Sequence, residues 1–242
     1  MLHHPWQSLG VLTVTWVLLI GALAGLGTLL SRTSGPALGW DRAVVAWLAG
    51  HRDPTLTAVL HHVGQLGSTR MVMLAVLVAA PLAVAITRTW QPVLLLAVGL
   101  LGELTLFLAT TAIVDRHRPD VPQLNPNLPP TSSFPSGHVA ATLVVYTGIA
   151  LLAHRLLRSW WRWPLVAAAA AVPVLVAVQR LYAGVHYPTD ILGSALLALP
   201  WILVCRHVLR TEDRTGRPHS GWRRTTGEGA ISIPPPTGGP GA

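Results

Sequence analysis

The chain has 242 residues, of which 51% are hydrophobic and 11% are charged. Soluble globular domains carry about 25% charged residues, so this composition excludes a soluble fold and predicts an integral membrane protein. The formal net charge is +8, and all 17 basic residues are arginine. These arginines lie between apolar runs, a pattern that favours membrane topology and anionic head groups over nucleic acid.

Six apolar runs predict membrane-spanning helices, which need about 20 apolar residues each. The second, fourth and fifth runs are short and must borrow flanking residues, so five spans are the alternative. The runs are 9–30, 71–86, 92–114, 139–153, 164–178 and 191–209. The predicted fold class is therefore all-α, a bundle of six transmembrane helices with short interfacial helices.

The first run has a second interpretation. Ala22-Leu23-Ala24 has the form of a cleavage triplet, as in a signal peptide. However, the run is long and no basic residue precedes it. We therefore expect a retained first helix.

Residues 31–70 are mixed in character, with apolar residues at helical spacing and a break at Asp53-Pro54. This pattern predicts two short amphipathic helices lying in the membrane interface. Residues 1–210 then form one membrane domain. Residues 211–242 are rich in Arg, Gly, Pro and Thr, and we expect them to be a disordered cytoplasmic tail.

A cytoplasmic N-terminus places a modest excess of arginine on the inner side, which predicts a multi-pass protein of the cell membrane. Arg116, Arg118 and Arg180 oppose this bias, because they crowd the outer ends of the third and fifth helices. Cations on the outer side need another explanation.

Polar residues from three separate loops gather at that predicted outer surface. They are Arg116, His117 and Arg118 after the third helix; Ser136, Gly137 and His138 at the start of the fourth; and Arg180, His186 and Asp190 between the fifth and sixth. Guanidinium groups match phosphate oxygens, and the free N–H groups of a helix start bind anions. The sequence therefore predicts a phosphate site facing the extracytoplasmic side.

Two histidines and one aspartate add chemistry to this site. Asp190 follows His186 by four residues, with Pro188 suited to the first turn of a helix. This spacing lets the carboxylate accept one ring N–H of His186 and leaves the other nitrogen as a nucleophile, while His138 can protonate a leaving oxygen. A metal site formed by His138, His186 and Asp190 is the alternative.

Three motifs in this order resemble the signatures of the type 2 phosphatidic acid phosphatase (PAP2) family, which shares its core with vanadium-dependent haloperoxidases. They are Arg118-Pro119, Pro135-Ser136-Gly137-His138, and Arg180 followed by His186 and Asp190. The resemblance spans about residues 41–209 and implies that His186 attacks phosphorus, Asp190 orients it and His138 is the general acid. It also implies that Arg118, Arg180, Ser136 and the Gly137 amide hold the phosphoryl oxygens, with no metal or other cofactor.

Two positions depart from the family pattern. Thr111 stands where the first motif has lysine, and Gln179 stands where the third motif has serine. A charge-assisted hydrogen bond contributes about 1.5–3 kcal/mol, so the missing cation needs a substitute. We expect Arg116 to supply it and to bind phosphate.

These observations predict a lipid phosphatase that hydrolyses a phosphomonoester or diphosphate on a membrane lipid, with the bilayer and that lipid as its partners. Polyprenyl diphosphate and phosphatidate are both candidates, and a composition typical of a GC-rich bacterial genome favours polyprenyl diphosphate. A lipid phosphotransferase and a non-catalytic lipid-phosphate binder are the alternatives. The oligomeric state stays open.

Glu103 lies in the middle of the third apolar run, where a charge costs about 2.5–3.5 kcal/mol or more. It is two helical turns from Thr111 on a similar face, so we expect it to point into the bundle. It either lines a substrate cavity or makes a structural hydrogen bond.

Overall fold

The computed structural model describes residues 5–33, 38–125, 131–157 and 159–215, which form eight α-helices and no strand. The helices are α1 (Pro5–Arg32), α2 (Gly39–Gly50), α3 (Pro54–Gln65), α4 (Thr69–Thr87), α5 (Gln91–Ile113), α6 (Gly137–Leu156), α7 (Arg162–Tyr182) and α8 (Pro188–Thr215). Six of them, α1 and α4 to α8, are long and apolar enough to cross a membrane. The prediction of an all-α bundle with six spans is confirmed, and the five-span alternative is wrong.

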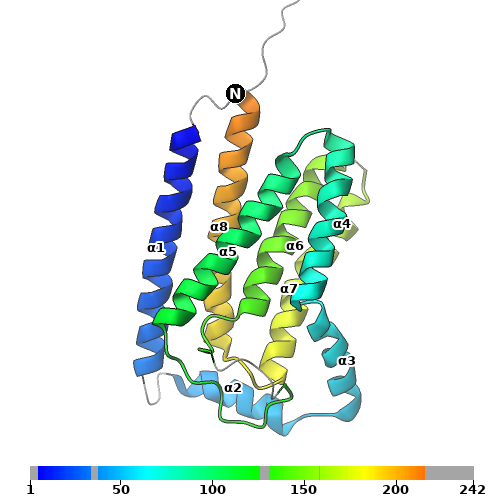
Figure 1. Cartoon of the computed structure of the whole chain (residues 1–242). Helices are drawn as coiled ribbons and strands as arrows, with labels where there is room; N and C mark the ends of the chain where they lie inside the picture. The colour runs from blue at the N-terminus through cyan, green and yellow to red at the C-terminus, as the bar shows by residue number, and fades with distance from the viewer. Residues whose placement is uncertain (1–4, 34–37, 126–130, 158, 216–242) are drawn as a thin grey trace, which may run out of the picture.

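Of the two short helices between α1 and α4, α2 lies across the end of the bundle at which α6 and α8 begin, and α3 rises beside that end toward α4 (Figure 1). They are separated at Asp53-Pro54, as expected. Asp53 caps α3 by accepting a hydrogen bond from the Leu56 amide at 2.9 Å, and Pro54 occupies the first helical position. Their position at a membrane interface stays a prediction.

Helix α6 is central and packs against α4, α5, α7 and α8 (Figure 1). Glycines permit this close packing, as is common between membrane helices. Gly148 of α6 faces Leu96 of α5, where an added Cβ would lie 2.8 Å from the leucine side chain. Leu96 and Ile202 of α8 are fully buried in the same core.

Helix α1 is an integral part of the bundle, since it contacts both α5 and α8. Leu23 is fully buried, and the Trp16 indole N–H donates to the Thr105 hydroxyl at 3.0 Å. The first apolar run therefore has the packing of a bundle helix, as we expected.

Phe134 anchors the loop that leads into α6. Its ring is fully buried between α1 and α8, where it packs against a glycine of each helix, Gly27 and Gly193. An added Cβ at Gly27 would lie 2.7 Å from the ring, and one at Gly193 would overlap it. The loop before α6 is thus positioned by a wedge between two spanning helices.

Helix α8 continues to Thr215, five residues beyond the expected domain boundary at 210. The expected disordered tail falls mostly on residues 216–242, which lie outside the described residues. That part of the domain division stays a prediction.

Close packing of α5 on α8 provides a test of the bundle. The Trp201 indole N–H donates to the Gly99 carbonyl at 2.9 Å, which holds the ring where an added Cβ at Gly102 would overlap it. We expect Gly102→Ala to destabilise the protein by about 1–3 kcal/mol through overpacking. A thiol-reactive dye that reports exposure of the buried Cys205 on heating measures this in detergent.

Gly25→Ala in α1 is the matched control, since nothing lies within 4 Å of an added Cβ there. Equal melting temperatures for the two variants would contradict the packing described.

Candidate active site

A cavity of about 330 Å³ opens among α4, α5 and α6. It brings together residues of all three predicted motifs, which come from separate loops. The motif residues that line it are Arg118, Pro135, Gly137, His138, Arg180 and His186, whereas Ser136 and Asp190 do not line it. The grouping expected from the sequence is therefore present in the fold.

The start of α6 forms one wall of this cavity. Ser136 occupies the N-cap position but does not cap the helix, and its buried hydroxyl has no partner among the described residues. The first bond to the helix runs from the Ala140 amide to the Ser136 carbonyl at 2.9 Å. A helix start of this kind is suited to bind an anion.

Gly137 is required here by the packing of α5. An added Cβ would lie 2.9 Å from the ring of Phe107, so this glycine makes room for a side chain of α5. Phe107 also lines the cavity, next to His138.

His186 is buried, and its Nδ1 lies 2.8 Å from the Ser133 carbonyl oxygen and 3.5 Å from Asp190 Oδ2. A carbonyl can only accept, so Nδ1 carries the proton and Nε2 keeps a free lone pair. Burial lowers the pKa of His186 below its ordinary value, against the opposing effect of Asp190. The ring is thus held as a neutral imidazole with one nitrogen available.

Asp190 has two closer partners than His186. Its Oδ2 accepts from the Tyr187 amide at 2.8 Å, and its Oδ1 accepts from Arg116. The carboxylate is fully buried at the start of α8. The Ser133 carbonyl, rather than Asp190, is therefore the group nearest to His186 that orients its ring. A sequence motif of side chains could not have indicated this backbone oxygen.

Arg116 is not where the sequence analysis expected it. Its guanidinium lies between Asp190 and Asp41, with Nη2 2.7 Å from Asp41 Oδ2. Asp41 also accepts from the Thr189 amide at 3.0 Å and hydroxyl at 2.7 Å. The structure does not bring Arg116 to the cavity of the histidines, because two buried carboxylates hold its fork on the other side of Asp190.

Arg118 and Arg180 do line the cavity, and each is held by one hydrogen bond. Arg118 donates to the Val185 carbonyl at 3.0 Å, and Arg180 Nε donates to Gln179 Oε1 at 2.6 Å. Burial lowers the pKa of Arg118, and nearby Asp190 opposes the effect. The remaining nitrogens of both fork groups make no hydrogen bond to the described residues, and are available to a ligand.

The two departures from the family pattern have structural explanations. Gln179, in place of serine, accepts a hydrogen bond from Arg180. Gly64 of α3 leaves room for the Gln179 side chain, since a Cβ added at Gly64 would lie 2.7 Å from the side-chain amide carbon of Gln179. Thr111, in place of lysine, donates to the Phe107 carbonyl of its own helix at 3.0 Å. Thr111 therefore brings no cation to the site.

The metal alternative finds no support in this arrangement. Within the part of the chain that the structure describes, no three His, Cys, Asp or Glu side chains are grouped to hold a metal ion. The oxygens of Asp190 are engaged by Arg116 and the Tyr187 amide.

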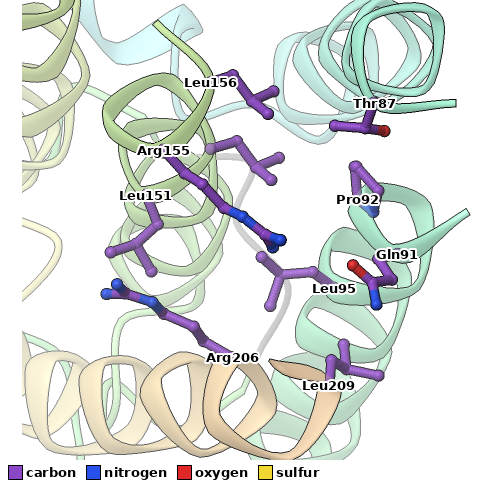
Figure 2. Close-up of a pocket in the computed structure, with 10 residues that line it drawn as sticks. Thr87, Gln91, Pro92, Leu95, Leu151, Arg155, Leu156, Arg206 and Leu209 are labelled. Atoms are coloured by element: carbon purple, nitrogen blue, oxygen red, sulfur yellow. The ribbon is translucent and has the colours of Figure 1, made fainter. Parts of the chain in front are cut away.

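A second cavity, of about 40 Å³, lies at the opposite end of the bundle, where α4 and α6 end and α5 begins. Figure 2 shows the side chains that line it. Arg155 of α6 and Arg206 of α8 lie in it among mainly apolar side chains such as Leu95 and Leu151. None of the residues lining it is a histidine or a carboxylate, so it lacks the groups for phosphoryl transfer. The histidine cavity is the candidate active site.

Comparison with known proteins agrees with this geometry. The profile of the PAP2 superfamily matches residues 92–214, a segment that includes all three motifs. The chain belongs to the PAP2 superfamily. Phosphatidylglycerophosphatase B of Bacillus subtilis is 31% identical over 150 residues, which cover 61% of this chain and 72% of the relative.

Two solved structures share the fold of this PAP2 protein. A transmembrane PAP2-type phosphatidylglycerolphosphate phosphatase from Bacillus subtilis has a TM-score of 0.66 at 24% identity, covering 86% of this chain and 96% of that one. LpxE of Aquifex aeolicus has a TM-score of 0.55 at 22% identity, covering 74% and 98%. With the family and the curated relative, the fold identifies this PAP2 protein as a membrane enzyme, a phosphatase of lipid phosphates.

The position of Arg116 leads to a test that separates a role in holding Asp190 from a role in binding phosphate. We expect Arg116→Lys to lower kcat with little change in KM, because one ammonium cannot join Asp41 and Asp190 as the planar fork does. Steady-state kinetics of phosphate release measure both constants.

Arg42→Lys is the matched control, an exposed arginine next to Asp41. A raised KM with unchanged kcat in Arg116→Lys would instead restore the phosphate-binding role that we expected from the sequence.

Proposed function

We propose that this enzyme hydrolyses a phosphomonoester or diphosphate on a membrane lipid through a phosphohistidine at His186. The observation that carries the proposal is the ring of His186, whose Nδ1–H is held by the Ser133 carbonyl while Nε2 is left with its lone pair. This nitrogen is the nucleophile, and it lies in a cavity that Arg118 and Arg180 also line.

The reaction proceeds in two steps. Nε2 of His186 bonds to phosphorus as the bond from phosphorus to the lipid oxygen breaks, and protonated His138 gives its proton to that oxygen. Neutral His138 then takes a proton from water as the water oxygen bonds to phosphorus and the bond from phosphorus to Nε2 of His186 breaks, which returns the lone pair to that nitrogen. Phosphate leaves, and both histidines return to their starting states.

The phosphoryl oxygens are bound by groups that lack partners among the described residues. The fork nitrogens of Arg118 and Arg180, the Ser136 hydroxyl and the Gly137 amide are the donors. Asp190 is a positioning residue in this scheme. It holds His186 from one side and is itself held by Arg116.

The cavity suits a lipid because its deeper wall is apolar. Val72, Met73, Leu100 and Leu104 of α4 and α5 line it below the arginines. Met73 and Leu104 are also exposed on the outside of the bundle, where the acyl chains of a bilayer would lie. A lipid can therefore place its phosphate at the histidines and its chains between α4 and α5.

Both a glycerolipid phosphate and a polyprenyl diphosphate fit these groups. The name of the Bacillus subtilis relative favours phosphatidylglycerophosphate, whereas the composition favours polyprenyl diphosphate. Water, rather than a second lipid, is the acceptor in our proposal. The active site faces the extracytoplasmic side, in accord with the arginines that gather at the opposite end of the bundle, such as Arg155 and Arg206.

His186→Asn tests the nucleophile. The asparagine amide can still donate to the Ser133 carbonyl, but no second ring nitrogen remains, so we expect phosphate release to fall below detection while the melting temperature in detergent stays near that of the unchanged protein. Rapid quenching with phosphorus-labelled lipid should trap an acid-labile protein label in the unchanged enzyme and none in the variant.

Full activity of His186→Asn would refute the mechanism. The same assay separates the alternatives, because a phosphotransferase yields labelled lipid in place of free phosphate when an acceptor is added. Strong inhibition by EDTA would favour the metal site.

Cysteine accessibility tests the orientation. Cys205 is buried, so a cysteine placed by Leu124→Cys near the active-site end is the thiol that reacts. We expect a membrane-impermeant maleimide to label it in intact cells. Thr89→Cys, in the connection between α4 and α5 at the other end, is the control and should be labelled only after lysis. The reverse pattern would invert the topology.

A further inference from the structure

Glu103 is a buried carboxylic acid in the wall of the active-site cavity. It is 2% exposed and is the only acidic side chain among the described residues that line this cavity. Nothing in the proposed reaction uses it. Its helix, α5, crosses the membrane, so the group needs an explanation.

The structure excludes one of the two roles expected from the sequence. Within the described residues, the Glu103 carboxyl makes no hydrogen bond and no ion pair, and hence no structural hydrogen bond. The other expectation holds, since the side chain lines the cavity. A polar group buried without a partner is unfavourable, so its hydrogen bond is left for a ligand to complete.

The depth of Glu103 below the phosphate site follows from two helices. Phe107 lies against Gly137 at the start of α6, and Glu103 is one turn deeper on α5, about 6 Å along its axis. On α6, Ala141 lines the cavity one turn beyond Gly137. A substrate with its phosphorus at His186 therefore brings the first few atoms of its alcohol to the level of Glu103.

The candidate alcohols differ at this depth. A glycerolipid phosphate has an ester oxygen or a hydroxyl three bonds from the phosphate-bearing oxygen, and either can hydrogen-bond a carboxyl group. A polyprenyl monophosphate has only hydrocarbon there. Its chain would bury the Glu103 carboxyl without any partner, which costs affinity.

We propose that Glu103 is a specificity-determining residue that hydrogen-bonds the glycerol oxygens of the lipid and so selects glycerolipid phosphates over polyprenyl phosphates. The inference rests on the proposed function and deepens it. The remaining wall residues at this depth, Leu100 and Leu104, offer only apolar contact and do not distinguish the two classes.

The test compares phosphomonoesters that differ only in the alcohol. Dioleoyl phosphatidate and farnesyl phosphate are given in the same detergent to the unchanged enzyme, Glu103→Leu and Glu103→Gln. We expect the unchanged enzyme to prefer phosphatidate, and Glu103→Leu to lower its kcat/KM for phosphatidate about tenfold or more. Its kcat/KM for farnesyl phosphate should be unchanged or raised, which also shows that the variant is folded.

Glu103→Gln keeps a donor and an acceptor of the same size, so we expect it to retain much of the preference. Leu100→Ala is the matched control on the same wall and should change both substrates alike. Dioleoyl phosphatidylglycerophosphate has a hydroxyl near its terminal phosphate, where phosphatidate has an ester. The fall in kcat/KM that Glu103→Leu causes for each of these two lipids therefore shows whether Glu103 binds a hydroxyl or an ester oxygen more strongly.

Two results would overturn the inference while leaving the proposed function intact. One is a preference of the unchanged enzyme for farnesyl phosphate. The other is a loss in Glu103→Leu that is equal for both substrates, which would make Glu103 a structural residue. If the unchanged enzyme releases phosphate from none of these lipids, the inference fails, and the phosphomonoester part of the proposed function fails with it.

Discussion

A single buried guanidinium connects the parts of the chain that make the active site. Arg116, in the loop after α5, is joined to Asp41 of the short helix α2 and to Asp190 of α8. Removing one member of a buried ion pair leaves an uncompensated charge and costs about 3–5 kcal/mol, so these three elements are strongly coupled. Asp190 is then fixed before any substrate arrives, and with it one side of His186.

The cavity combines two environments that rarely adjoin. At one end, the fork nitrogens of two arginines and a helix start form a site suited to an anion. At the other end, leucines of α5 and residues of α4 provide a surface like the bilayer interior. Glu103 lies between them and, among the described residues of α5 that line the cavity, is the one polar side chain. The shape and chemistry of the cavity thus follow the boundary between the head group and the chain of a lipid.

Much of the fold and of the site could be predicted from the sequence, but the reasons differ between the membrane spans and the site residues. The six spans follow from apolar runs, since the bilayer imposes a length and a composition on each helix. The residues of the cavity follow from motifs with fixed spacing, such as Arg180 and His186. Arg116 was misplaced because its partner Asp41 lies 75 residues earlier, and local spacing cannot reveal such a contact. The Ser133 carbonyl was missed because backbone atoms carry no residue signature.

The contact between Gly64 and Gln179 has a consequence for how this protein can differ from its relatives. Gln179 occupies a place where the family motif has a smaller residue, and α3 approaches it so closely that position 64 has no space for a side chain. The two positions are therefore coupled. A relative with serine at position 179 is free to have alanine or a larger residue at position 64, whereas one with glutamine needs glycine. Covariation of this pair among relatives would record when in the history of the family the arginine at position 180 acquired a side-chain partner.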